Sequence, residues 1–71
     1  MNNNWITIKW TVVSKENGET VNWGKCITLV KEGKLPESYQ LPIYKTLTAL
    51  WPMDKYEVTI PYKRGIDTNF E

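Results

Sequence analysis

The chain has 71 residues, and nine basic side chains against eight acidic ones give it a net charge of +1. This length fits one small domain, and the near neutrality argues against a dominant electrostatic partner such as a long phosphate backbone. Because there is one cysteine and no histidine, an intramolecular disulfide and the familiar zinc sites are excluded. We expect no metal and no cofactor.

The composition is rich in large aromatic residues and in lysine and asparagine. Four Trp and four Tyr supply surface for a compact core or for a partner. Eight Lys against one Arg, with six Asn, indicate AT-rich coding DNA, as in low-GC bacteria and their phages. Apolar runs stay far below the roughly 18 residues that span a bilayer, and residues 1–4 lack the basic start of a signal peptide. We therefore expect a cytoplasmic protein with no membrane partner.

Residues 5–31 have the pattern of a β-hairpin. In residues 5–13 apolar and polar side chains alternate, and Asn17-Gly18 is typical of a two-residue type I′ turn. Centring the turn there gathers the apolar residues of both arms on one face, and a one-residue slip would scatter them. The predicted pairs are Val12 with Trp23, Trp10 with Lys25, Ile8 with Ile27 and Ile6 with Leu29.

Residues 20–32 also permit a helix. Trp23, Cys26, Ile27 and Val30 fit helical spacing. Gly24 and the β-branched residues count against a helix and favour the strand.

The second half of the chain predicts a loop, a short helix and a last strand. Residues 32–38 contain Gly and Pro, and residues 42–51 follow with Ile43, Leu47 and Leu50 on one helical face before Pro52. Leu47, Ala49 and Trp51 also alternate as in a strand, so both structures remain open for residues 42–51. Residues 56–62 alternate again, and Pro61 assigns that strand to a sheet edge.

These elements predict an α+β fold. Three antiparallel strands in the order 2-1-3 form a small sheet, and one short helix packs on one face in a β-β-α-β arrangement. Residues 1–71 form a single domain, in which residues 1–4 and 65–71 are expected to be flexible tails.

Catalytic chemistry is not indicated. Cys26 is expected to face away from the core opposite Lys9, and neither it nor Ser14 or Ser38 has a histidine to act as a base. The acidic residues lie mostly in turns, loops and the tail, without the spacing of a catalytic pair. We expect a protein that is not an enzyme.

The predicted sheet has more apolar surface than a short helix covers. Eleven apolar residues share the inner face, while a helix of about ten residues is only about 15 Å long. Either part of this surface serves another chain, or Trp51, Tyr39, Leu41 and the loop complete the lid. The outer face is expected to be polar, with one aromatic residue, Trp5; its other members are Thr7, Lys9, Thr11, Val30, Lys55, Thr59 and Lys63.

Protein binding is the function that these features favour. The candidate anchors for a partner are aromatic residues of the chain, which has more of them than is usual for its length: Trp5, Trp23, Tyr39, Tyr44, Trp51 and Tyr62. In size and layout the chain resembles small phage-encoded host-takeover proteins, several of which are compact β-β-α-β inhibitors, and this resemblance implies an inhibitor of a host or competing protein. The alternative is nucleic-acid binding through Trp5, Lys9, Lys55 and Lys63.

Self-association is a further expectation. Residues 20–31 form an edge strand that only Lys25 and Lys31 protect. A weak homodimer is therefore expected, either through this edge or through exposed inner faces.

Overall fold

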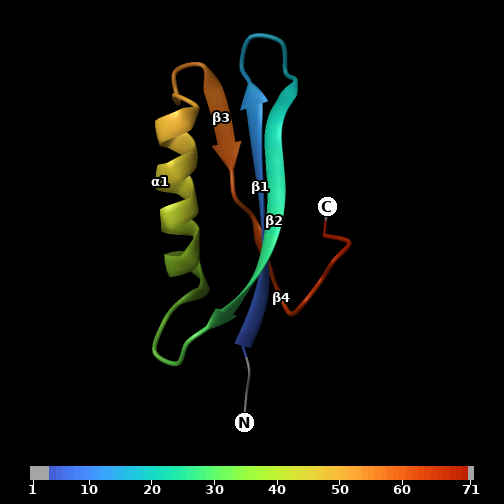
Figure 1. Cartoon of the computed structure of the whole chain (residues 1–71), viewed down its shortest axis with the longest axis vertical. Helices are drawn as coiled ribbons and strands as arrows, with labels where there is room; N and C mark the ends of the chain where they lie inside the picture. The colour runs from blue at the N-terminus through green and yellow to red at the C-terminus, as the bar shows by residue number, and fades with distance from the viewer. Residues whose placement is uncertain (1–3, 71) are drawn as a thin grey trace.

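The computed structural model describes residues 4–70 and contains a four-stranded antiparallel sheet with one α-helix on one face (Figure 1). The elements are β1 (Asn4–Ser14), β2 (Thr20–Val30), a 3-10 helix η1 (Pro36–Tyr39), α1 (Gln40–Leu50), β3 (Tyr56–Thr59) and β4 (Tyr62–Arg64). β1 lies at the centre, in the order β2-β1-β3, and β4 also pairs with β1. The predicted α+β fold and strand order are confirmed. Of the predicted tails, residues 1–3 and 71 lie outside the described residues.

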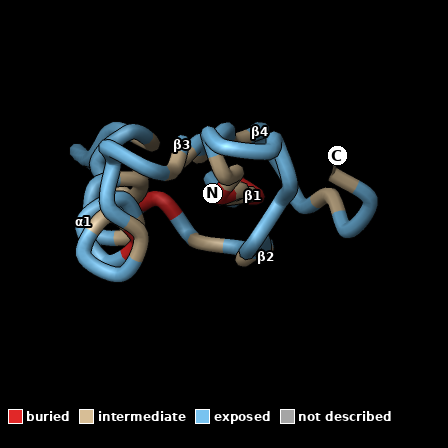
Figure 2. Tube along the Cα trace, turned by 90° about the horizontal axis from the view of Figure 1, so that it is seen from above, coloured by how far each residue is buried: buried red, intermediate tan, exposed pale blue. Residues whose placement is uncertain are grey.

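The molecule is a thin stack of layers. Seen from above, α1 lies on one side of the sheet and the C-terminal segment on the other (Figure 2). The Cα trace extends 47 × 24 × 12 Å, so few side chains can be fully enclosed. The buried residues are Ile6, Thr7, Ile8, Val12, Val30 and Leu47.

The connection between β1 and β2 is wider than predicted. The Ser14 N–H donates to the Glu19 carbonyl, and the Gly18 N–H donates to the Ser14 carbonyl, both at 2.8 Å. Gly18 has φ +74°, a conformation that glycine adopts without strain. A bulge then follows, because Val12 pairs with Asn22 while Val13 pairs with Thr20. The prediction of a two-residue turn was wrong.

Together, the wider turn and the bulge shift β2 by one residue relative to the predicted register. Ile8 pairs with Cys26, and Trp10 pairs with Gly24. Because side chains alternate along a strand, this shift exchanges the two faces of β2. Cys26 therefore packs against the core, and Lys25 lies on the outer face opposite Lys9.

Four other predicted orientations also change. Trp23, Ile27 and Leu29 leave the inner face and are exposed, whereas Val30 is buried with the core instead of lying outside.

Trp10 supplies the physical reason for this register. Its indole lies directly over Gly24, where an added Cβ would be 2.2 Å from the ring. The indole N–H donates to Asn22 Oδ1 at 3.2 Å. The inner side of β2 consequently needs small residues beneath the indole, and the large apolar residues of β2 take the other face.

Between the alternatives left open by the sequence, the helix is confirmed in residues 42–50 and the strand is confirmed in residues 20–30. α1 begins two residues before Pro42, which is tolerated in a first turn because its missing N–H would have no partner there. It ends where Trp51 adopts an extended conformation before Pro52. Leu47 is buried against the sheet, but Leu50 is 68% exposed and does not belong to the packed face.

The predicted last strand is divided in two. β3 ends at Thr59 and β4 begins at Tyr62, because Pro61 has no N–H for the ladder. The Pro61 carbonyl still accepts a hydrogen bond from the Lys9 N–H at 3.0 Å, so the chain stays beside β1.

Candidate binding surfaces

Three of the predicted aromatic anchors are half-buried and stabilise the fold itself. Tyr39 Oη accepts a hydrogen bond from the Lys31 N–H at 3.1 Å. Tyr62 packs against the core and donates to Glu37 Oε2 at 3.0 Å, a bond that raises the pKa of Tyr62 above 10.0. The third, Trp51, meets the Tyr56 ring edge-on at 5.1 Å.

The other three anchors are exposed, on two different faces. Tyr44 lies on α1, where its hydroxyl donates to Met53 Sδ at 2.8 Å. Trp5 and Trp23 lie on the side of the hairpin that faces away from α1. The structure thus divides the predicted set between the core, the helix and the hairpin.

We call the outer hairpin face the surface formed by Trp5, Lys9, Trp23, Lys25, Ile27 and Leu29. Its four apolar side chains are exposed by 37% at Trp5, 61% at Trp23, 42% at Ile27 and 40% at Leu29. Trp5 lies directly opposite Leu29, and Lys9 lies opposite Lys25 in the middle of the face. The expectation of one aromatic residue among polar ones on this face was wrong.

The C-terminal segment, residues 65–70, crosses this surface at Thr7. Thr7 Oγ1 donates to the Gly65 carbonyl and accepts from the Asp67 N–H, both at 2.8 Å. Thr7 is only 1% exposed as a result. These bonds attach part of the predicted tail to the centre of the sheet.

Charged groups hold the same segment. Lys63 Nζ lies 2.7 Å from Asp67 Oδ2, and this contact lowers the pKa of Asp67 below 3.8. Lys63 Nζ is also 5.4 Å from the centre of the Phe70 ring, and Lys25 Nζ donates to the Thr68 carbonyl at 2.8 Å. Lys63 therefore already has an anionic partner.

The four residues predicted to bind nucleic acid do not form one cluster. Trp5 lies near the start of β1, whereas Lys55 precedes β3, whose first residue pairs with Ser14 at the other end of β1. Nine residues of strand separate these ends, about 30 Å. Lys9 lies between them, beside Lys25.

Grooves remain on both sides of the helix. One, of about 610 Å³, lies between α1 and β3 and includes Leu41, Tyr44 and Val58; another, of about 390 Å³, includes Trp10 and Ile43. α1 therefore covers the middle of the inner face and leaves apolar side chains exposed along its borders.

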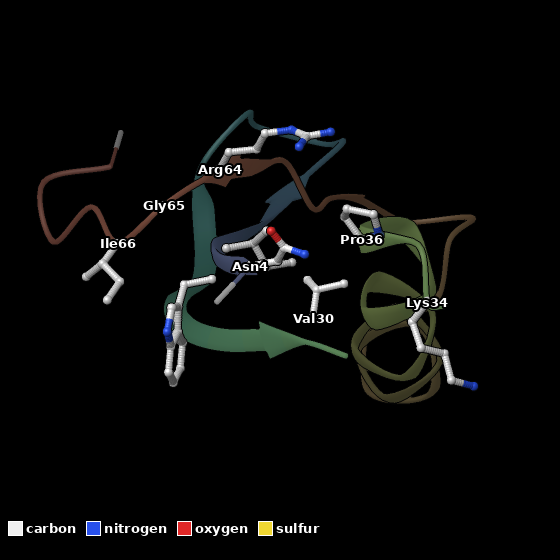
Figure 3. A pocket seen from close by; sticks show the side chains of 9 residues that line it. Asn4, Val30, Lys34, Pro36, Arg64, Gly65 and Ile66 are labelled. Atoms are coloured by element: carbon white, nitrogen blue, oxygen red, sulfur yellow. The ribbon is translucent and has the colours of Figure 1, made fainter. Parts of the chain in front are cut away.

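A further pocket, of about 510 Å³, lies where β1 begins (Figure 3). Its two cationic side chains, Lys34 and Arg64, extend away from its centre and away from each other. They do not converge as an anion site requires.

Within residues 4–70 there is no group of three metal-ligating side chains, and no helix has the length and apolar character needed to cross a bilayer. No protein-family model, curated protein or solved structure matches the chain.

Sequence reasoning missed four members of the outer hairpin face: Trp23, Lys25, Ile27 and Leu29. A signal was present: Gly24, Cys26 and Thr28 are small and alternate along β2, and they lie opposite the large Trp10, Ile8 and Ile6. Matching large to small residues across the two arms selects the observed register.

Proposed function

We propose that this chain is a non-enzymatic protein-binding module and that its partner docks on the outer hairpin face. The observation that carries the proposal is the exposure of four large apolar side chains, Trp5, Trp23, Ile27 and Leu29, on one side of a two-stranded segment. Such a concentration on a small domain is typical of an interaction surface. Tryptophan is also enriched among the residues that dominate binding energy.

The charges indicate the chemistry of the partner. Lys9 and Lys25 lie directly opposite each other, and like charges in that position repel. A carboxylate on the partner would relieve the repulsion while apolar side chains cover the indoles. We infer a folded protein with an acidic group within an apolar surface.

The size and outline of the chain support a more specific proposal. They resemble those of small phage-encoded inhibitors, and the lysine and asparagine bias agrees with such a source. We propose that the chain inhibits a host or competing protein in the cytoplasm of the host cell.

Affinity capture with matched variants tests the docking surface. Ile27→Asp places a carboxylate on the outer hairpin face at an exposed position, and Leu50→Asp makes the same change on an exposed part of α1. We expect the parent chain and Leu50→Asp to retain one stoichiometric partner from cells of the source organism, and Ile27→Asp to lose it. Equal capture by both variants, or no stoichiometric partner at all, contradicts the proposal.

A second candidate is binding of single-stranded nucleic acid. The observation that favours it is that Trp5 and Trp23 flank Lys9 and Lys25 on one face, where bases could stack and phosphates meet ammonium groups. Titration with single-stranded and duplex oligonucleotides at several salt concentrations decides it. Weak binding without salt dependence removes this candidate.

A further inference from the structure

The free edge of β2 is an interaction surface distinct from the outer hairpin face. β2 pairs only with β1 among the described strands, and it lies in front of β1 in Figure 1 and at one border of the sheet in Figure 2. An unpaired edge presents a row of backbone donors and acceptors that can pair with another strand.

The hydrogen bonds of β1 identify the groups on this edge. The Lys9 N–H points to the Pro61 carbonyl and the Trp5 carbonyl accepts from the Gly65 N–H, so the odd-numbered residues of β1 face β3 and β4. The even-numbered residues therefore face β2, where Ile8 pairs with Cys26 and Trp10 with Gly24. Because backbone direction alternates, the opposite parity of β2 points away from the sheet. The edge groups belong to Trp23, Lys25, Ile27 and Leu29, and in residues 4–70 no hydrogen bond occupies them.

The opposite border of the sheet is protected. β3 has four residues, Pro61 interrupts the ladder, and the Gln40 side chain donates to the Ile60 carbonyl. β2 has eleven residues and no proline. Pairing with another chain is thus far better supported at β2 than at β3.

We propose that a second copy of this chain pairs antiparallel with β2, with Cys26 opposite the partner's Cys26. The regular part of the edge runs from the bulge at Val21 to Lys31, whose N–H is already bonded to Tyr39. Residues 22–30 lie between these limits, and Cys26 is their midpoint. With Cys26 opposite the partner's Cys26, all of residues 22–30 in one copy pair with residues 22–30 in the other.

The side chains are self-complementary in this register. Trp23 lies beside the partner's Leu29, and Lys25 lies beside the partner's Ile27, where its stem can cover apolar surface. A shift by one residue in each copy would place Lys25 opposite the partner's Lys25, which is unfavourable. The reverse shift would place Trp23 opposite the partner's Lys31, and the Lys31 N–H is already bonded to Tyr39.

The dimer is expected to be weak. Nine residues per copy form the contact, whereas a standard interface uses about 20–30 residues on each side. A dissociation constant on the order of micromolar follows. The edge hydrogen bonds lie in the plane of the sheet, so the dimer does not depend on the proposed docking of another protein, and purified chain alone suffices to test it.

Sedimentation of the purified chain gives the first test. At about 100 µM, well above a micromolar dissociation constant, we expect dimer that dissociates on dilution. Ile27→Pro removes one edge N–H without touching the bonds to β1, and we expect it to stay monomeric, whereas Ile27→Val should still dimerise. Circular dichroism confirms that both variants are folded. A strictly monomeric parent chain, or a dimer unaffected by Ile27→Pro, overturns the proposal.

The native thiol gives a test specific to the register. In an antiparallel ladder, a pair that exchanges no hydrogen bonds has Cα atoms about 4.5 Å apart, within disulfide range. Diamide, which accepts the two thiol hydrogens, should therefore link Cys26 to the partner's Cys26. The control is Cys26→Ser with Thr28→Cys, which moves the thiol along the same face. Disulfide formation should be at least about tenfold faster in the parent chain than in this control, because pairing raises the effective thiol concentration at Cys26. Equal rates in the two chains overturn the register.

Discussion

Substitution Gly24→Ala tests the contact that sets the register of the hairpin. The new Cβ would lie 2.2, 2.6 and 2.8 Å from three atoms of the Trp10 indole, so the ring must leave its position. Overpacking of this kind costs about 1–3 kcal/mol. Loss of the indole hydrogen bond to Asn22 adds about 1 kcal/mol. We therefore expect the free energy of unfolding to fall by about 2–4 kcal/mol, and the midpoint of thermal unfolding to fall by about 10 °C or more in a domain of this size.

A double-mutant cycle separates this collision from other effects of the substitution. In a Trp10→Leu background the obstructing ring is gone, and Gly24→Ala should be neutral or stabilising by up to about 1 kcal/mol, because alanine loses less backbone entropy than glycine. Urea unfolding followed by circular dichroism measures all four corners of the cycle. If Gly24→Ala costs the same in both backgrounds, the collision with Trp10 is not its cause and the argument is refuted.

Three further predictions concern the C-terminal segment and the loop before α1. Thr7→Val removes two hydrogen bonds while keeping the shape of the side chain, so it should lower the free energy of unfolding by about 1–3 kcal/mol and speed amide exchange at Asp67. Thr7→Ser keeps the hydroxyl and should do neither. Unchanged amide exchange at Asp67 in Thr7→Val contradicts this prediction. Lys63 holds the pKa of Asp67 below 3.8, so the ion pair stabilises the fold above pH 3.8. This stabilisation is lost as the pH falls through the pKa that Asp67 has in the folded protein. A carboxyl NMR titration of Asp67 with a midpoint at or above 3.8 would count against the contact. The bond to Glu37 raises the pKa of Tyr62 above 10.0, so this bond stabilises the fold below pH 10.0, and the stabilisation is lost as the pH rises through the pKa of Tyr62 in the folded protein. Spectrophotometric titration of the parent, compared with Tyr62→Phe, should show one tyrosine that titrates late. Glu37→Ala should shift that titration to lower pH.

Sequence patterns predicted those parts of the fold that several independent constraints determine. In β1 the alternation of Ile6, Ile8 and Val12 admits one buried face, and these residues are buried. The end of the helix before Pro52 was likewise predicted, although the alternation of its residues also fitted a strand and its start lies two residues before Pro42.

The register of β2 was underdetermined, because Asn17-Gly18 fits both a tight turn and a wider loop. The bulge at Val21 has no side-chain signature, and the alternating apolar residues of β2 looked suited to the core. The core instead excluded them, since Trp10 already occupies the space over Gly24.

The contacts of the C-terminal segment could not be predicted for a different reason. Thr7 binds a backbone carbonyl and a backbone N–H of that segment, and because every residue except proline has both groups, no pattern of side chains in the sequence predicts the contact.

The central position of β1 has a consequence for how a newly made chain folds. The hairpin joins segments that are close in sequence, so its contacts can form early and locally. The other side of β1 must wait for distant segments, since Ile8 pairs with Tyr62 and Ile6 with Arg64. During synthesis the strand that becomes most enclosed therefore keeps one side unpaired longest, and closing that long loop against its entropy is the step expected to limit the folding rate.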